Sequence, residues 1–536
     1  MEPEKQQRSQ KNEHNTTGSV TSGNTFSYWI DSVEPIKFKP LRGNLSTDVV
    51  IIGAGISGLT TAYCLAKSGK KVVVVDDGFV GSGETGRTTA HVSNALDDRY
   101  SEIEKLHGSD GAKLAADSHT AAIGFIESTA MAEGIDCDFK RLNGYLFLHS
   151  TDTKENLLKE FEATHRAGIQ TEWLESVSGI TLEDGPCIKF PHQGQFHPLK
   201  YLAGLTNALL KLGGEIYTET RISSIQENEV KTSNEFAITA EHIVVATNSP
   251  INDLFTMHTK QYPYRTYVIG VLVPRDAIEA ALWWDTGDQD SEWSSMPYHY
   301  VRLQPYSQDF DLLICGGEDH KTGQEDEDDL TATERFDRLE NWLRKRFDRC
   351  GQVLYRWSGQ VMEPLDAMGY IGRNPGNKEI YIVTGDSGNG ITHGTIAGML
   401  INDLIMGREN PWEKLYDPGR ISLQVTGEYI QEAAGMVAQY GDYMSKGDIQ
   451  SPAELQVGKG AILGSGLKKY AVYKDEGGVT HQYSAVCPHL GCIVQWNELE
   501  KSFDCPCHGS RFTCEGKLIN GPAKTDLKRF DSVDLE

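Results

Sequence analysis

The stretch "DVVIIGAGISGLTTAYCLAKSGKKVVVVDD", from Asp48 to Asp77, sets out in order the parts of a dinucleotide-binding unit. A run of β-branched residues predicts a buried strand, and Gly53, Gly55 and Gly58 follow it in the G-x-G-x-x-G pattern. The first glycine permits a tight turn, the second lets the backbone approach a pyrophosphate, and the third lets the next helix pack on the strand. The N-terminus of that helix then faces the phosphates.

A second predicted strand, "KVVVVD", ends at Asp76. A carboxylate at this place can accept hydrogen bonds from an adenosine ribose, and it disfavours a 2'-phosphate. The order of strand, glycines, helix, strand and acid favours a bound dinucleotide over a glycine-rich turn without a ligand. These residues alone do not distinguish FAD from NAD.

Two later segments supply further candidates. In the loop "GSGETGRTTAHVS", Arg87, Thr88 and Thr89 are candidates to line a cofactor, and an ordinary surface loop is the alternative. The segment "EIYIVTGDSGNGITHGTIAGMLINDLI" predicts a strand, a glycine-rich turn with Asp386, and a helix from about Thr392. The start of such a helix offers free N–H groups to a carbonyl or to a reduced ring that carries negative charge.

From Asp48 to about Met406, these segments resemble the flavoprotein family of glycine and D-amino-acid oxidases, sarcosine oxidases and related dehydrogenases. The segments "RISSI", "HIVVATN" and "WSGQVMEPLDAMGYIG" are part of the match. The resemblance implies FAD and an α/β, Rossmann-like FAD-binding domain with an α+β substrate subdomain. It places the turn with Asp386 and Gly390 over the flavin ring and Ile222 beside the cofactor.

The tryptophan-containing segment departs from the family pattern. Relatives that oxidise amino acids commonly carry an arginine two residues after its glycine, whereas here Gly359 is followed by Gln360 and Val361. Neither residue can bind a carboxylate bidentately as a guanidinium does, which argues against an ordinary amino-acid substrate. Arg265 or Arg302 could replace the missing group, although we expect both to be solvated at the surface.

The sequence identifies no catalytic acid or base. The candidates occur in short polar segments and are more simply explained as structural histidines and packed tyrosines: His91, His197, Tyr298, His299 and Tyr300. No second strand–glycine–helix–acid unit follows downstream, so we expect the electron donor to be a small substrate bound against the flavin rather than a nicotinamide.

The segments "CPHLGC" and "CPCHGS" near the end of the chain form a metal-binding pattern. Cys487 and His489 have the spacing C-x-H, and Cys505 and His508 have C-x-x-H. Two thiolates and two imidazoles are the ligands of a Rieske 2Fe-2S cluster, in which the cysteines hold one iron and the histidines the other. Zinc is the alternative, but the spacing differs from that of zinc fingers.

These loops resemble the Rieske proteins of respiratory and photosynthetic cytochrome complexes. The resemblance implies a disulfide between Cys492 and Cys507, with buried free thiols as the alternative. Ser510 matches a family residue that donates a hydrogen bond to a cluster sulfur, whereas Phe512 stands where the family has a tyrosine donor. We therefore expect a lower reduction potential than in those proteins. "GPA", residues 521–523, matches the loop that covers the cluster.

These features divide the chain into four parts. We expect a disordered polar tail at residues 1–24, an FAD-dependent oxidoreductase domain at 25–425, a helical connector at 426–450 and a small all-β Rieske domain at 451–536.

Composition limits the partners and the location. A net charge of −25 and a pI near 5.1 disfavour binding to nucleic acid. The polar start of the chain has no apolar signal-peptide core, and no segment is a clear transmembrane helix. We therefore expect a cytoplasmic protein.

The two halves together resemble FAD-dependent oxidoreductases with a fused Rieske module. Because flavin accepts two electrons at once and the cluster takes one at a time, we expect an amine, amino acid or hydroxy acid to reduce FAD and the electrons to pass singly to the cluster. An external carrier, a protein or a quinone, would then exchange electrons at an exposed edge formed by His489 and His508. One alternative is a Rieske oxygenase using His192 and His197, although Lys189 stands where that motif needs an aspartate. The other is a redox sensor without turnover.

Overall fold

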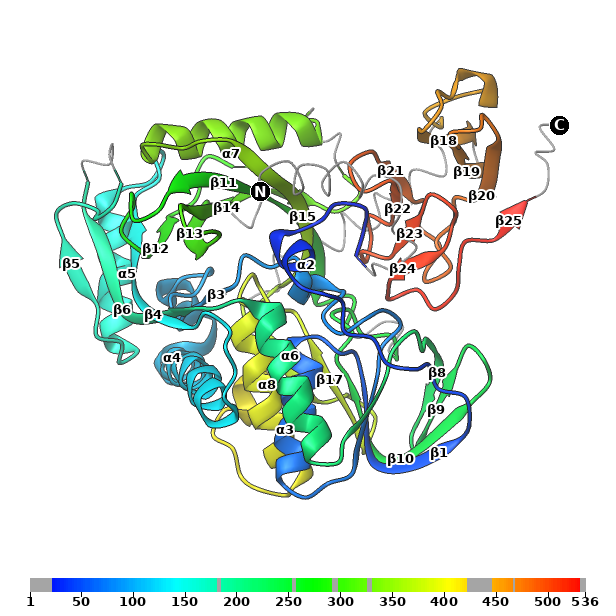
Figure 1. The fold of residues 1–536 in the computed structure, drawn as a ribbon, viewed down its shortest axis with the longest axis horizontal. Coiled ribbons are helices and arrows are strands. Elements are labelled where there is room, and N and C mark those ends of the chain that lie inside the picture. The colour runs from blue at the N-terminus through cyan, green and yellow to red at the C-terminus, as the bar shows by residue number, and fades with distance from the viewer. Residues whose placement is uncertain are drawn as a thin grey trace.

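The computed structural model describes residues 22–180, 185–252, 257–291, 297–324, 330–421, 446–465 and 468–530. Within these ranges the chain forms a flavoprotein part built on two large sheets and a small C-terminal part built on two short sheets (Figure 1). Most of the expected connector, residues 426–445, lies outside the described residues, as does the start of the expected tail.

The first large sheet carries the dinucleotide-binding unit. Its central strand β1 (Leu45–Ile52) pairs in parallel with β2 and β10, and its last four residues are fully buried, as expected for a strand covered on both faces. The order is β16-β17-β10-β1-β2-β7, with β8 and β9 attached through β10. The other bounds are β2 (Val72–Val75), β7 (Glu215–Tyr217), β8 (Ile222–Gln226), β9 (Glu229–Thr232), β10 (Ala237–Val245), β16 (Tyr370–Arg373) and β17 (Ile380–Thr384).

Three helices that pack together lie over this sheet in Figure 1. They are α3 (Ile56–Lys67), α6 (Pro198–Lys211) and α8 (Gly390–Ile405). The first helix begins directly after the glycine turn. The last begins two residues earlier than its sequence indicates, because the glycine-rich turn already passes into helix at Gly390.

The second large sheet also belongs to the flavoprotein part and has the order β15-β11-β14-β13-β12-β4-β6-β3, with β5 paired to β6. Helix α7 packs on β11 and β14. The strands are β3 (His91–Val92), β4 (Lys140–Phe147), β5 (Glu172–Leu174), β6 (Cys187–Gln195), β11 (Gln261–Pro274), β12 (Leu282–Asp285), β13 (Tyr300–Pro305), β14 (Phe310–Lys321) and β15 (Val353–Pro364). The remaining helices are α2 (Tyr28–Ser32), α4 (Tyr100–Glu133), α5 (Lys154–Arg166), α7 (Ala332–Arg346) and α9 (Glu413–Tyr416).

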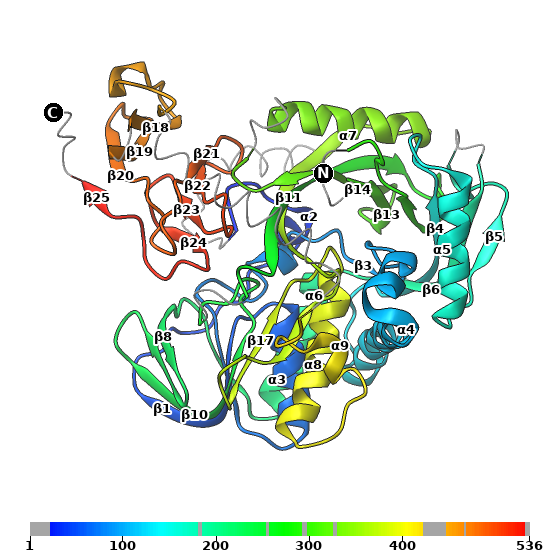
Figure 2. The ribbon, with the colours of Figure 1, turned by 180° about the vertical axis from the view of Figure 1, so that it is seen from behind.

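The C-terminal part is all-β in its described residues, as the sequence predicts. One sheet has the order β18-β19-β20-β25 and the other β21-β22-β23-β24. Figure 2 shows this part beside the long strand β11. The bounds are β18 (Gly460–Ser465), β19 (Lys468–Lys474), β20 (Thr480–Ser484), β21 (Gln495–Asn497), β22 (Ser502–Asp504), β23 (Arg511–Thr513), β24 (Leu518–Asn520) and β25 (Arg529–Phe530). The two cysteine- and histidine-containing loops follow β20 and β22.

Candidate active site and metal centre

The glycine turn after β1 has no room for side chains. Gly53 has φ +110°, and a Cβ atom there would lie 2.3 Å from the carbonyl oxygen of Ala246. A Cβ atom on Gly58 would lie 1.9 Å from the carbonyl oxygen of Gly53. The turn therefore holds α3 tightly against β1, and the start of the helix borders a cavity.

Asp76 lies at the end of β2, at the edge of the same cavity. Its carboxylate accepts hydrogen bonds from the N–H groups of Ala54, at 2.6 Å, and Gly78, at 2.8 Å. Burial and the neighbouring Asp77 raise the pKa of Asp76 to about 7. This position suits hydrogen bonding to ribose hydroxyls and is unfavourable for an additional phosphate.

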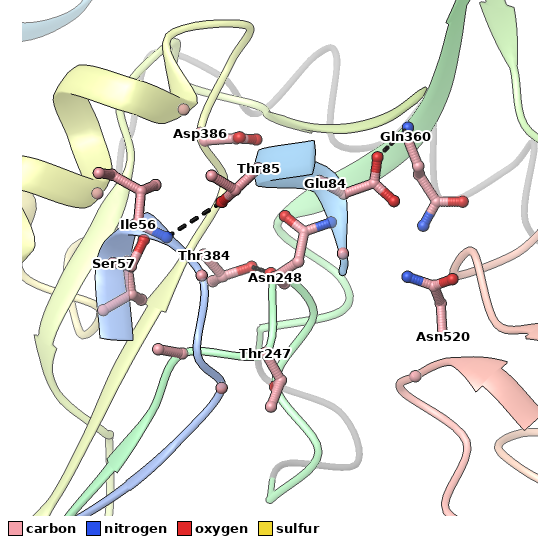
Figure 3. Close-up of a pocket in the computed structure, with 18 of the residues that line it drawn as sticks. Ile56, Ser57, Glu84, Thr85, Thr247, Asn248, Gln360, Thr384, Asp386 and Asn520 are labelled. Atoms are coloured by element: carbon pink, nitrogen blue, oxygen red, sulfur yellow. Dashed lines mark hydrogen bonds between the residues drawn. The ribbon is translucent and has the colours of Figure 1, made fainter. Parts of the chain in front are cut away.

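The cavity continues from this turn to the start of α8 and reaches the C-terminal part. Figure 3 shows Gln360 of β15 and Asn520 of β24 beside each other across this boundary. Its walls include backbone and side chains of Gly53, Gly55, Asp76, Arg87, Thr88, Ile222, Asn248, Thr266, Val361, Asp386, Gly388, Gly390, Asn520 and Ala523. A glycine turn, a helix N-terminus and a strand-end acid within one continuous cavity fit the pyrophosphate and ribose of FAD.

Most residues predicted at the cofactor border this cavity; Gly58 and Thr89 do not, and Arg87 borders it with its guanidinium bound elsewhere. Gly58 lies behind the turn, in the helix–strand contact. Thr89 is not part of the wall, and its hydroxyl lies 3.0 Å from Nδ1 of His91. Arg87 borders the cavity, but its guanidinium donates to the carbonyl oxygens of Ser358, at 2.8 Å, and Thr25, at 2.7 Å.

The sequence interpretation missed Glu84 and Thr85. Thr85 accepts a hydrogen bond from the N–H of Ile56 at 3.0 Å, and Glu84 accepts one from the N–H of Gln360 at 2.8 Å (Figure 3). Both stand in the same loop as Arg87, but no local pattern marks them, because their partners come from distant parts of the chain.

The expectation that Arg265 and Arg302 are solvated is wrong. Both side chains are fully buried because the second sheet closes over them. Arg265 donates to the hydroxyl of Ser358 at 2.6 Å. Arg302 donates to the carbonyl oxygens of Ala90, at 2.7 Å, and Phe196, at 3.0 Å, and burial lowers its pKa to about 9. Both guanidinium groups are thus engaged by the protein.

The candidate histidines have structural partners. His91 lies 3.2 Å from the carbonyl oxygen of Val301, and His197 accepts a hydrogen bond from the N–H of Lys200 at the start of α6. His299 contacts the carboxylate of Asp285 at 2.8 Å, which together with Glu318 raises its pKa to about 9 despite burial.

An acidic cluster lies beside the α8 end of the cavity, and we define it as Asp97, Asp98, Asp319, Glu363 and Asp386. None of these carboxylates forms an ion pair with a residue that the structure describes. Burial raises the pKa of every member, to about 7 for Asp98 and Asp319 and to about 6 for Asp97 and Asp386.

Asp386 and Thr266 connect the acidic cluster with the cavity, and Ser387 links two of its acids to each other. Ser387 donates to Glu363 at 2.9 Å and also contacts Asp98. Thr266, in the cavity wall, lies 2.6 Å from the hydroxyl of Tyr300 and also bonds to Asp319. A positively charged group at this end of the cavity would therefore face Asp386 directly, while the other members of the acidic cluster lie outside the cavity wall.

The four predicted cluster ligands meet between the two C-terminal loops. Cys487 and Cys505 are buried side by side, and a hydrogen bond from Cys505 lowers the pKa of Cys487. The rings of His489 and His508 lie 4.8 Å apart. A paired thiol set beside a paired imidazole set fits the unequal irons of a Rieske cluster. The structure also joins Cys492 to Cys507 by a disulfide.

The predicted exposed histidine edge is wrong for His508, which is only 5 % exposed. His489 is half-buried, with both ring nitrogens shielded from solvent. His258 of the flavoprotein part packs against both ligand rings, at 4.8 Å from His489 and 5.9 Å from His508. Burial and the two neighbouring histidines lower the pKa of His508 to about 3. The sequence showed the loops as exposed because nothing local indicates that another domain covers them.

The residues around the cluster sulfurs allow a prediction of reduction potential. Ser510 hydrogen-bonds to Cys487, while Phe512, two residues later, is fully buried. We expect Phe512→Tyr to raise the midpoint potential because its hydroxyl supplies another donor to the cluster region, and Ser510→Ala to lower it. Redox titration followed by absorbance measures both; equal midpoints in all three proteins would contradict the prediction.

A mononuclear iron site of the oxygenase type is not found in the described ranges. Within those ranges, one group of three potential ligand side chains (His, Cys, Asp or Glu) is placed to share a single metal ion. It consists of Cys492, Cys505 and Cys507. Across the same residues, the helices lack the length and apolar character needed to span a bilayer.

Comparisons with known proteins agree with these two sites. Residues 48–404 match the family of FAD dependent oxidoreductases, and residues 446–531 match the Rieske [2Fe-2S] domain. The chain is 30% identical over 513 residues to YhfW of Bacillus subtilis, named as a Rieske 2Fe-2S iron-sulfur protein, covering 94% of this chain and 97% of that one.

Two further comparisons concern the flavoprotein part. The chain is 28% identical over 397 residues to gamma-glutamylputrescine oxidoreductase of Escherichia coli, covering 72% of this chain and 89% of that one. The crystal structure of glycine oxidase from Geobacillus kaustophilus shares the fold, with a TM-score of 0.57 and 18% identity, covering 70% of this chain and 99% of that one. The chain belongs to the FAD-dependent oxidoreductases, binds FAD, and carries a Rieske domain that binds a 2Fe-2S cluster.

Proposed function

We propose that this oxidoreductase oxidises a cationic amine at FAD and passes the electrons one at a time to its own Rieske cluster. When bound, FAD would accept a hydride from the C–H bond beside the amine nitrogen after the ammonium has lost its proton, which leaves an imine. The cluster would take one electron at a time and deliver it to an external one-electron acceptor. Each oxidised amine thus requires two successive passages through the cluster.

The relay is supported chiefly by the way the two cofactor sites share one wall. Gln360, which borders the FAD cavity, donates through Nε2 to the carbonyl oxygen of Gly509 at 3.2 Å. Gly509 follows the ligand His508 directly. On the other side, Asn520 and Ala523 of the Rieske domain border the FAD cavity. A short separation between redox groups favours direct electron transfer within the chain.

The preference for an amine is supported by the charges at the cavity. Val361 stands in place of the arginine of amino-acid-oxidising relatives, and the buried arginines nearby are engaged elsewhere. The acidic cluster instead offers negative charge to an ammonium group. A relative is named for gamma-glutamylputrescine, a compound with amino groups.

Anaerobic titration with a panel of substrates tests both parts. Diamines and N-alkyl amines are expected to bleach the flavin, and the absorbance of the oxidised cluster should then decrease; amino acids and hydroxy acids should react much more slowly. Bleaching by simple amino acids alone would refute the substrate class. Reduced flavin beside a permanently oxidised cluster would refute the relay.

The pH dependence follows from the acidic cluster. Its raised pKa values, about 6 for Asp97 and about 7 for Asp98, mean that these carboxyls are neutral in acid and become charged as the pH rises. The KM for a cationic amine should therefore decrease as the pH rises from about 5 to about 8, a range in which the amine itself stays protonated.

Asp386→Asn should raise the KM at least about tenfold at pH 8, because Asp386 borders the cavity and a charge-assisted contact contributes about 1.5–3 kcal/mol. It should also flatten the pH profile. Asp110→Asn is the matched control, since Asp110 is 98% exposed on α4. An unchanged profile in the Asp386 variant would show that the substrate does not bind at the acidic cluster.

A further inference from the structure

Glu500 of the Rieske domain is buried inside the flavoprotein part. It lies in the turn between β21 and β22 and is only 2 % exposed. Its carboxylate lies 3.2 Å from both Arg87 and Arg265. The same carboxylate accepts hydrogen bonds from the N–H of Thr25, at 2.9 Å, and from its hydroxyl, at 2.6 Å, and Ser358 also contacts it.

The electrostatics make this contact specific. Burial by itself would raise the pKa of Glu500, but Arg87, Arg265 and Arg511 hold it well below its usual range. The carboxylate is therefore charged, and so are the arginines around it. Removing one charged partner from this buried group leaves the charges of the others uncompensated. The contact therefore stabilises the two domains only when they are docked in this one arrangement. Asn497 further fixes the turn by accepting the N–H of Glu500 at 2.9 Å.

The contact surface continues from Glu500 along both cluster-binding loops. A Cβ atom on Gly323 would lie 3.0 Å from the backbone nitrogen of Pro506, and one on Gly509 would lie 2.6 Å from Pro263. Beyond the cluster, Arg221 donates to the carbonyl oxygen of Leu518 at 2.6 Å. The two domains thus approach each other too closely for the cluster-binding loops to move along the surface of the flavoprotein part.

We propose that Glu500 is a positioning residue that anchors the Rieske domain in a fixed orientation, with its two histidine ligands turned inward against His258. The cluster then exchanges electrons with the flavin through its buried histidine edge, and an external acceptor meets a different face of the domain. This inference depends on the proposed function only for the source of the electrons. Each reduced FAD supplies two electrons, and each transfer reduces one oxidised cluster, which the acceptor then reoxidises.

Hydrogen exchange of the full, cofactor-loaded chain tests the docking without any substrate. In the unmodified protein, amides of residues 505–510 and 257–265 should exchange as slowly as those of β1. Fast exchange in both segments would show a loosely attached domain and would overturn the proposal, whatever the fate of any variant.

Substitution of Glu500 tests its role in electron transfer. In Glu500→Ala, exchange at these segments should rise at least about tenfold, and the rate of cluster reduction after photoreduction of the flavin should fall by at least about tenfold. Both rates in Glu500→Gln should lie between those of the unmodified protein and those of Glu500→Ala, because glutamine keeps the shape of the side chain and one acceptor oxygen. FAD content, iron content and the yield of photoreduced flavin should stay unchanged, which separates a positioning effect from loss of structure.

Glu498→Gln is the matched control. Glu498 lies in the same turn, but it pairs with Lys459 at 2.6 Å and with Lys501, both within the Rieske domain. This variant should behave as the unmodified protein does. Wild-type exchange and wild-type rates of cluster reduction in Glu500→Ala would overturn the proposal, whereas a failure of amines to reduce the flavin would affect only the proposed substrate.

Discussion

Gly58→Ala is expected to weaken FAD binding by at least about tenfold, because overpacking at a tight contact costs about 1–3 kcal/mol. A Cβ atom at this position would lie 1.9 Å from the carbonyl oxygen of Gly53, which is backbone and cannot rotate away. Helix α3 must then move away from β1, and the N–H groups at its start lose their alignment with the pyrophosphate site. Fluorescence titration of the apoprotein with FAD measures the effect.

Gly124→Ala provides the control for the general effect of alanine. Gly124 lies within α4, and a Cβ atom there has no atom within 4 Å. In a helix this change should stabilise the fold by about 1 kcal/mol and leave the FAD affinity unaltered. If Gly58→Ala also bound FAD normally, the close packing of α3 on β1 would not be needed to form the site.

Cys487→Ser is expected to abolish the cluster while FAD remains bound. Cys487 is buried beside Cys505, and a serine hydroxyl is a poor replacement for a thiolate ligand to iron. Iron should fall from about two atoms per chain to near zero. Substrate should still bleach the flavin, but electrons should no longer reach a one-electron acceptor.

Cys514→Ser is the matched control for this variant. Cys514 is a half-buried thiol in the same domain, close to Tyr473 and outside the ligand set. Iron content and electron transfer should match those of the unmodified protein. Retention of iron in Cys487→Ser, or isolation of the unmodified chain with zinc in place of iron, would contradict the assignment of these ligands.

The parts of the site that depend on local spacing could be predicted from the sequence. Gly53 and Gly55 fall in the turn between β1 and α3, and Asp76 follows the next strand, so their roles can be read from a short stretch of chain. The pairs Cys487–His489 and Cys505–His508 are likewise set within two short loops. The family resemblance supplied the flavin, because no local pattern separates FAD from NAD.

The parts that depend on packing between distant segments could not be predicted. Glu500 stands in an unremarkable acidic turn, and its partner Arg87 is 413 positions earlier in the chain. Arg265 looks like a surface cation until the second sheet and the Rieske domain enclose it. The inward orientation of His508 and the gathering of the acidic cluster have the same origin, since both need contacts that no sequence window contains.

Residues near the start of the described chain form hydrogen bonds with residues of the C-terminal Rieske domain. The carbonyl oxygen of Ser22 accepts a hydrogen bond from Arg511, 489 positions later, and Thr25 bonds to Glu500, 475 positions later. During synthesis, residues 22–25 emerge long before Glu500 and Arg511, so these contacts can form only after the last domain has emerged. Because domains generally fold as they emerge, closure of this N-terminal segment should be a late step of folding.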